Sequence, residues 1–290
     1  PEKIFRNTTA TSVRTAVSGW LGATAPYEGI SPSDISTLSE NATEAERCAE
    51  ACRWLRGGKY RLVMVYFTAL DEAGHKYGPR SEEAKASAVE LDSLAALIAE
   101  AAGPEASILV VSDHGMTEVE RCLHLYDYLK AIRVHATPLA SGGTANLYLK
   151  PGQDLDNALT ALRNQDMFDS VDSRGIYDVF TGEDLPEHYR NICQDRSGDI
   201  VLVGHEGSYF REHNRRRTFL NPPKVPGMHG FDPASDGMAG IFIAFGPGIK
   251  KGVELETARC VDIYPTACRL LGIDPAQNID GHPIQDILKE

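Results

Sequence analysis

YRLVMVYF at residues 60–67 and ASILVVS at residues 106–112 are the two apolar runs that decide the fold. Both are rich in β-forming residues and nearly all apolar, which is typical of strands buried on both faces of a sheet. Between them the sequence predicts a helix from Ser81, its N-cap, to about Ala102. The apolar positions of this helix recur at steps of three and four residues: Ala84, Ala88, Leu91, Ala95, Ile98 and Ala102. A strand–helix–strand unit of this kind predicts a parallel sheet.

The remaining elements extend this arrangement. A third strand is expected at residues 240–245, and a helix from about Asp262 to Leu271. The middle of the chain carries shorter elements between loop-rich connections: strands at 144–150, 176–180 and 199–203, and a helix near 156–164. We therefore predict an α/β fold with a mostly parallel central sheet sandwiched by helices. Its core comprises residues 1–119 and 226–290, and residues 120–225 form a small α+β lid inserted into it.

The composition excludes several classes of protein. Of the 290 residues, 42% are hydrophobic and 24% are charged, which is ordinary for a globular protein and excludes a disordered or fibrous chain. No apolar run approaches the roughly 20 residues of a membrane-spanning helix. The net charge of −12 argues against binding to a nucleic-acid duplex. It also repels anionic ligands unless a metal ion or a basic pocket reverses the local field.

Cysteines and glycosylation sequons carry weaker signals. Six cysteines are too few for a disulfide scaffold in a chain of this length. Cys48 and Cys52 lie four residues apart in an expected helix, and we interpret them as two thiols on one face rather than a metal pair. Two N-x-[ST] sequons begin at Asn7 and Asn41, where about one is expected by chance. They slightly favour a secreted, periplasmic or cell-surface location over a cytoplasmic one.

Chemically active side chains gather in three clusters. Asp71 and His75 follow the first apolar run, Asp113 and His114 follow the second, and His229 lies in GMHGFD at residues 227–232. The first two clusters are placed at the carboxyl ends of predicted parallel strands, where open α/β sheets place their sites. Carboxylate oxygen and neutral imidazole both suit Zn²⁺. Five such ligands are too many for one tetrahedral site, so the residues predict a two-metal hydrolytic centre.

At these clusters the chain resembles the type I phosphodiesterase/nucleotide pyrophosphatase family of the alkaline phosphatase superfamily. The resemblance rests on DEAGHKYGP at residues 71–79, SDHGM at 112–116 and HGFD at 229–232, in this order. It spans about residues 60–285, and EDLPE at 183–187 resembles a turn in the small subdomain of that family. The resemblance implies an alkaline phosphatase-like fold.

The resemblance also implies a set of metal ligands and a reaction. Asp71, His75 and His229 would hold one Zn²⁺, and Asp113 and His114 would belong to a second, with other divalent metals possible. The implied activity is hydrolysis of phosphodiester or pyrophosphate bonds in a small, nucleotide-like phosphorylated substrate. A phosphonoacetate hydrolase-like enzyme, which cleaves a C–P bond, is one alternative. A non-catalytic relative that retains the fold and a metal site is another.

The nucleophile is not identified in these residues. The family uses a Thr or Ser hydroxyl and an additional Asp ligand from an N-terminal segment, and no matching segment is found in residues 1–290. We therefore expect both upstream of Pro1. The hydroxyls of Thr8, Thr9 and Thr11 are the first candidates within the chain.

Overall fold

The computed structural model contains both helices and strands, and it describes residues 13–20, 22–25, 30–39, 41–168, 175–189, 197–213 and 218–289. The helices are α2 (Glu44–Arg56), α3 (Ala69–Tyr77), α4 (Glu82–Ala102), α5 (Leu125–Ala131), α6 (Leu155–Arg163) and α7 (Cys260–Leu271). The strands of the first half are β1 (Thr15–Ser18), β2 (Asp34–Ile35), β3 (Leu62–Val65), β4 (Ile108–Val111), β5 (Thr117–Glu118), β6 (Arg121–His124) and β7 (Ala136–Ser141). Those of the second half are β8 (Thr144–Leu149), β9 (Tyr177–Phe180), β10 (Ile200–Gly204), β11 (Ser208–Arg211), β12 (Leu220–Asn221), β13 (Gly227–Met228) and β14 (Phe242–Phe245).

The chain divides into two units, each assembled from separate stretches of sequence. The first unit comprises residues 1–70, 85–113 and 241–290, and the second comprises residues 71–84 and 114–240. The second unit therefore takes in more than the predicted insertion, because it includes residues 71–84, 114–119 and 226–240 as well. The limits of 120–225 for a lid stay a prediction.

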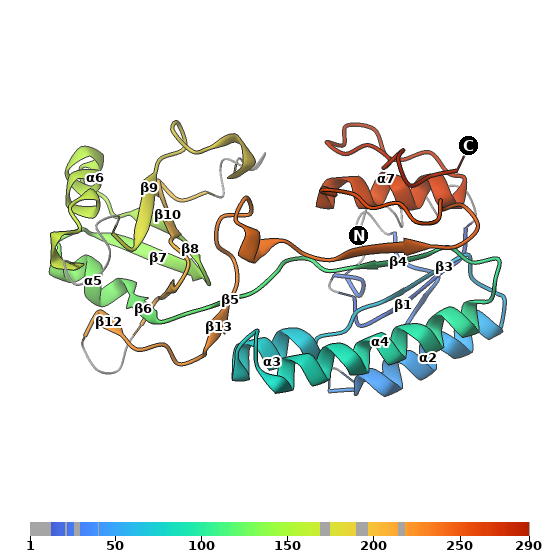
Figure 1. The fold of residues 1–290 in the computed structure, drawn as a ribbon. Coiled ribbons are helices and arrows are strands. Elements are labelled where there is room, and N and C mark those ends of the chain that lie inside the picture. Colours follow the sequence, from blue (N-terminus) through green and yellow to red (C-terminus); the bar gives the residue numbers. More distant parts are fainter. Residues whose placement is uncertain are drawn as a thin grey trace. The chain divides into compact units, whose positions relative to one another are not determined.

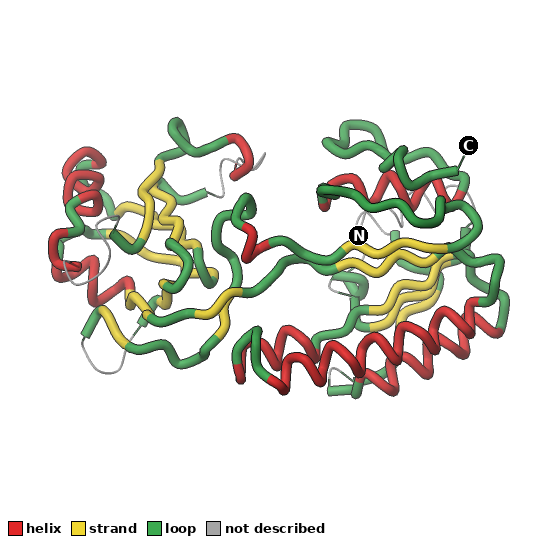
Figure 2. Tube along the Cα trace, in the orientation of Figure 1, coloured by secondary structure: helices red, strands yellow, loops and turns green. Residues whose placement is uncertain are grey.

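The first unit has a layer of strands between helices. Strand β1 pairs in parallel with both β2 and β3, whereas β4 pairs with β14 in antiparallel orientation. Figure 1 shows α2 and α4 along one side of these strands and α7 along the other. Figure 2 shows the strands of this unit as neighbouring segments of one layer. This is the predicted arrangement of a sheet sandwiched by helices, with an antiparallel pair at β4 and β14.

Two expectations about helix ends are confirmed. The hydroxyl of Ser81 accepts a hydrogen bond from the backbone N–H of Ala84 at 3.1 Å, as an N-cap of α4 does. Helix α7 ends at Gly272, whose φ of 68° lies in the left-handed region. Helix α2 begins with a capping box between Thr43 and Glu46, which the sequence analysis did not anticipate.

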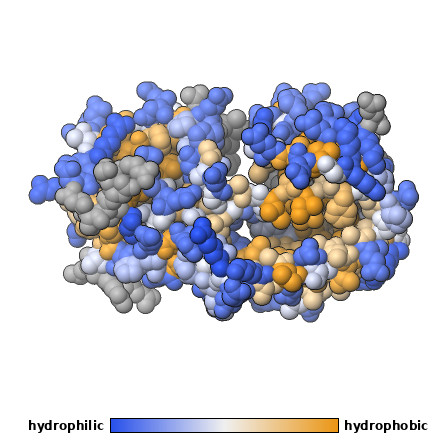
Figure 3. Space-filling view, viewed as in Figure 1, coloured by the Kyte–Doolittle hydropathy of each residue, from blue (hydrophilic) through white to orange (hydrophobic). Residues whose placement is uncertain are grey.

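The strands β3 and β4 differ from the expectation that both faces are buried. All four residues of each strand are partly exposed. In the described part of the chain, β3 pairs with β1 alone and β4 with β14 alone, so each strand is covered by a neighbour on one edge only. Strand β14 likewise leaves Ile243 54% and Phe245 44% exposed. Figure 3 shows apolar surface over the first unit, as these exposures imply.

The second unit is built around a four-stranded antiparallel sheet with the order β7-β8-β10-β9. Its core draws on this sheet, on α5 and α6 and on the neighbouring strands, and its fully buried members include Leu123, Leu125, Tyr128, Leu147, Leu162, Ile176, Ile200 and Leu202. The predicted strands at 144–150 and 199–203 are thus β8 and β10, which pair with each other. A second sheet has the order β11-β6-β12, and β5 forms an antiparallel ribbon with β13.

None of the described helices combines the length and the apolar character that crossing a bilayer requires.

The core of the second unit can be tested by a matched pair of leucines in its four-stranded sheet. Leu202 is fully buried on β10, and Leu139 is 55% exposed on β7. We expect Leu202→Ala to lower the free energy of unfolding by about 2–5 kcal/mol, because it removes buried surface and leaves a cavity. Leu139→Ala should change it by about 0.5 kcal/mol or less. Urea denaturation of both variants measures the difference, and equal losses would contradict the assignment of this core.

Candidate metal centre

Helix α3 places two of the predicted ligands on one face. Asp71 and His75 are four residues apart, which brings side chains together on a helix surface. The Nε2 atom of His75 lies 3.6 Å from Oδ1 of Asp71. These residues were expected after a strand, with no helix assigned to them, and the helix supplies the geometry that pairs them.

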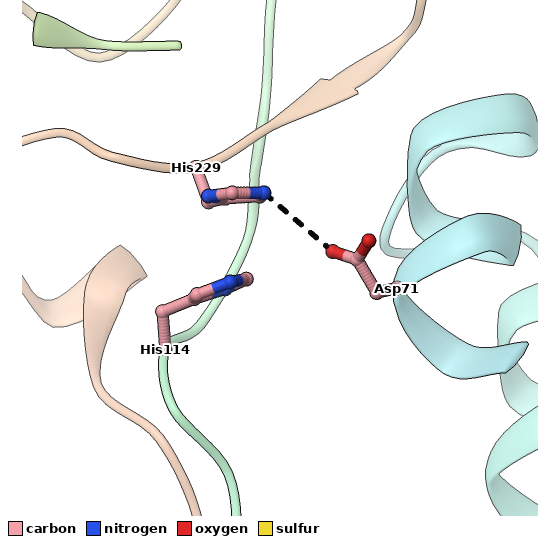
Figure 4. Close-up of side chains that lie close together, drawn as sticks. All are labelled: Asp71, His114 and His229. Atoms are coloured by element: carbon pink, nitrogen blue, oxygen red, sulfur yellow. Dashed lines mark ion pairs between the residues drawn. The ribbon is translucent and has the colours of Figure 1, made fainter. Parts of the chain in front are cut away.

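The ribbon of β5 and β13 brings two further ligands together. Thr117 pairs with Met228 in antiparallel register, so the residue after β13 runs beside the segment that precedes β5. These flanking positions hold His229 and His114. Their rings stack with centroids 3.7 Å apart and an interplanar angle of 17°. Figure 4 shows both rings with Asp71 of α3 directed toward them.

Three ligand atoms converge in this arrangement. One ligand atom each of Asp71, His114 and His229 lies within 4.8 Å of the other two. Oδ1 of Asp71 is 3.7 Å from Nε2 of His229, the ion pair drawn in Figure 4. This oxygen is buried and has no hydrogen-bond partner among the described residues, although the Asp71 side chain as a whole is 41% exposed. A buried carboxylate oxygen without a hydrogen bond is costly unless a cation balances it.

Backbone carbonyls fix the orientation of two of the imidazoles. Nδ1 of His75 is 2.9 Å from the carbonyl oxygen of Gly227, and Nδ1 of His114 is 2.9 Å from that of Gly115. A carbonyl only accepts, so each Nδ1 carries the proton and donates it. In the neutral form of each ring the lone pair is then on Nε2, and a carbonyl partner of this kind is what metal-binding imidazoles use on their second nitrogen.

The distances fit a small divalent cation. Zn²⁺ binds imidazole nitrogen and carboxylate oxygen at about 2.0–2.2 Å, so neighbouring ligand atoms of a tetrahedral site are about 3.4 Å apart. The separations of Asp71 Oδ1 from His75 and His229, 3.6 and 3.7 Å, are close to this value and too long for hydrogen bonds. The donor set of one carboxylate and neutral imidazoles is one that zinc accepts.

The five predicted ligands are placed as follows. Asp71, His114 and His229 form the group described above, and His75 adjoins it through Asp71, with its ring centroid 5.0 Å from that of His229. Asp113 belongs to the first unit, where its Oδ2 accepts a hydrogen bond from the hydroxyl of Tyr66 at 3.2 Å. The assignment of His75 and His114 to two different ions stays a prediction. Thr8, Thr9 and Thr11 lie outside the described residues.

Glycines set how closely these segments approach. A Cβ on Gly227 would lie 2.3 Å from the carbonyl oxygen of Gly74 and 2.9 Å from Sδ of Met116. Only glycine therefore allows β13 to lie against α3, with Met116 beside both. The sequence analysis noted the glycines near each cluster, but the contact between Gly74 and Gly227 joins positions more than 150 residues apart, which spacing does not reveal.

A second pair of glycines, which the sequence analysis missed, supports His229. The backbone N–H of Gly143 donates to the carbonyl oxygen of His229 at 2.9 Å. A Cβ on Gly142 would lie 2.3 Å from that same oxygen, and one on Gly143 would lie 2.5 Å from the ring of Phe231. The available signal was the glycine pair at 142–143, directly before a predicted strand.

The contact between Gly227 and Gly74 generates a prediction. Gly227→Ala should destabilise the second unit by about 1–3 kcal/mol, because a methyl group there overlaps backbone atoms. It should also weaken zinc binding, since the carbonyl of Gly227 orients His75. Urea denaturation and a zinc competition titration measure the two effects. Gly182→Ala is the control, because nothing lies within 4 Å of the added Cβ. Similar values for the two variants would contradict the close approach.

Comparison with known proteins identifies the family. The model of the family "Type I phosphodiesterase / nucleotide pyrophosphatase" matches residues 1–232. Ectonucleotide pyrophosphatase/phosphodiesterase family member 7 of Rattus norvegicus is 28% identical over 242 residues, which are 80% of this chain and 52% of the relative. The bis(5'-adenosyl)-triphosphatase of Pongo abelii is 24% identical, over 91% of this chain and 56% of the relative. The chain thus spans about half the length of the curated relatives it matches.

Solved structures confirm the predicted fold class. Murine ectonucleotide pyrophosphatase/phosphodiesterase 5 matches with a TM-score of 0.81 and 26% identity, over 99% of this chain and 74% of that one. An inactive variant of the same murine protein, in complex with AMP, matches with a TM-score of 0.81 and 25% identity, over 98% of this chain and 74% of that one. The match to the family model covers well over half of the 290 residues, and the chain belongs to the type I phosphodiesterase/nucleotide pyrophosphatase family.

Proposed function

We propose that this protein is a metal-dependent hydrolase that cleaves phosphodiester or pyrophosphate bonds in small nucleotide-like substrates. Membership of the family supports the reaction class. The name of one relative, a bis(5'-adenosyl)-triphosphatase, and the AMP complex of a solved relative support a nucleotide-like substrate. The observation that carries the proposal is Oδ1 of Asp71, a buried oxygen without a hydrogen bond that faces the Nε2 atoms of two histidines.

The proposed cofactor is a pair of Zn²⁺ ions. Asp71 and His229 would hold one ion together with His75, and Asp113 and His114 would contribute to the other. Such ions, when bound, orient a phosphoryl group and neutralise the charge that develops on its oxygens. The identity of the metal and the number of ions are part of the proposal.

The side chains of this chain prepare the site for an anion. The net charge of −12 disfavours the approach of a phosphorylated substrate over long distances. Attraction must therefore be local, and bound cations would supply it. The hydrogen bonds from His75 and His114 to backbone carbonyls hold their rings in a fixed orientation. A fixed ring orientation spares the site from reorganising when substrate binds.

A Thr or Ser hydroxyl is the proposed nucleophile. Attack on phosphorus by such a hydroxyl would split the reaction into two steps, with a covalent phosphoryl-enzyme between them. We propose further that the protein works outside the cytoplasm, in a secreted, periplasmic or cell-surface location. The exposure of Asn41 in its sequon is compatible with modification there.

A panel of substrates tests the reaction class. The full-length protein, supplied with Zn²⁺, is assayed with bis-p-nitrophenyl phosphate, p-nitrophenyl phosphate and phosphonoacetate. We expect the diester to be hydrolysed fastest. Turnover of phosphonoacetate alone would favour a C–P hydrolase, and absence of turnover with all three would favour a non-catalytic relative.

Zinc binding tests the ligand set independently of activity. Asp71→Asn and His229→Ala each remove a ligand, so zinc affinity should fall by more than the roughly 10–100-fold that loss of an outer hydrogen-bond partner costs. His135→Ala is the control, since His135 is an exposed histidine of the same unit. Competition titration with a chromogenic chelator gives the affinities. Wild-type affinity in both ligand variants would rule out this centre.

A further inference from the structure

The loop that carries His229 depends on a glycine with unusual freedom. Gly230 has a φ of 82°, in the left-handed region, and follows His229 directly. Glycine restricts the backbone less than any other residue, so the direction of the His229 ring is not fixed by local backbone preferences. Anchors on either side of Gly230 must fix it.

Two of these anchors are the contacts of His229 and Phe231. The carbonyl oxygen of His229 accepts a hydrogen bond from the N–H of Gly143. Phe231 is 4% exposed and packs in a cluster with Val119, Cys122, Tyr209 and Met238. The first contact holds the backbone of His229 and the second holds the ring of Phe231. Neither holds Asp232, at the end of the loop.

Asp232 supplies the third anchor, and it joins two segments far apart in sequence. Its Oδ1 accepts a hydrogen bond from the N–H of Ala234 at 2.8 Å and lies 3.1 Å from Nε2 of His188. The hydroxyl of Tyr189 also donates to the Asp232 carboxylate. His188 and Tyr189 belong to a short 3-10 turn at Glu187–Tyr189, which begins at the last residue of the EDLPE motif at 183–187.

The environment of Tyr189 keeps its hydroxyl a donor. Burial first, and then the hydrogen bond to Asp232 and its charge, raise the pKa of Tyr189 far above its ordinary value. The ring also contacts His188, with centroids 4.3 Å apart, and Phe180, with centroids 6.1 Å apart. Two neighbouring side chains of the turn, those of His188 and Tyr189, therefore contact the carboxylate of Asp232.

We propose that Asp232, held by His188 and Tyr189, is a positioning residue that fixes the loop carrying His229. The inference rests on the proposed function only for its consequence, zinc affinity; the anchoring of the loop stands on the contacts alone. The side chains of His188 and Asp232 are 46% and 43% exposed, and exposed ion pairs contribute little to global stability. Loss of these contacts should therefore loosen the loop while leaving the unit folded.

Amide hydrogen exchange tests the anchoring without any metal. In Asp232→Ala and in the double variant His188→Gln/Tyr189→Phe, we expect the Gly143 and Ala234 amides to exchange at least about tenfold faster, because local opening becomes easier. Asp232→Asn should restore most of the protection, since its amide oxygen still accepts from Ala234. His135→Gln is the control, because His135 is an exposed histidine of the same unit.

A zinc titration on the same variants, with urea denaturation to confirm folding, separates the two proposals. We expect zinc affinity to fall about tenfold in Asp232→Ala, as for the loss of an outer-shell partner. Exchange within twofold of wild type in folded Asp232→Ala would overturn the anchoring, whatever the zinc result. Faster exchange with unchanged zinc affinity would overturn the role of Asp232 in positioning His229 as a ligand. If the wild-type protein binds no zinc and exchange is still faster in the variants, the anchoring is supported and the metal centre is refuted instead.

Discussion

The site depends on the contact between two glycines, Gly74 in α3 and Gly227 in β13. A Cβ at Gly227 would lie 2.3 Å from the carbonyl oxygen of Gly74, so the helix and the ribbon meet at a distance that no other residue permits. The helix contributes Asp71 and His75, and the ribbon contributes the two stacked histidines that flank it. A steric constraint on the backbone therefore determines which ligand side chains come together.

The electrostatic consequence is concentrated on one atom. Oδ1 of Asp71 is buried, lacks a hydrogen bond and faces imidazole nitrogens from two directions. Backbone carbonyls accept hydrogen bonds from Nδ1 of His75 and His114, so in the neutral form of these rings the lone pair is on Nε2. Without a cation this arrangement would carry an uncompensated desolvation cost. A cation bound there would balance the buried carboxylate oxygen of Asp71 and turn this cost into a favourable interaction.

In the first unit, the apolar sequence of the strands does not match their burial. Its apolar strands β3 and β4 are partly exposed along their length, and β14 leaves alternate large side chains in solvent. Continuous apolar runs predict strands that are covered on both faces, and this local prediction identified the strands correctly. Coverage, however, depends on which segments lie beside them, and burial is therefore a tertiary property that composition does not report.

The sequence by itself determined part of the helices and strands, the family and the candidate ligands. Hydrophobic period and an N-cap placed α4, and a terminal glycine ended α7, each within a few residues of the observed ends, because caps and helix periodicity are local. The three motifs identified the family, since order and spacing survive in sequence even when overall identity is low.

Only the tertiary structure decided which ligands meet. Asp71 and His75 are neighbours because α3 is a helix, and His114 adjoins His229 because β5 pairs with β13. The placement of Asp232 against His188 and Tyr189 joins loops more than 40 residues apart. Such contacts follow from chain topology and close backbone approach, which are properties of pairs of segments and not of any one segment.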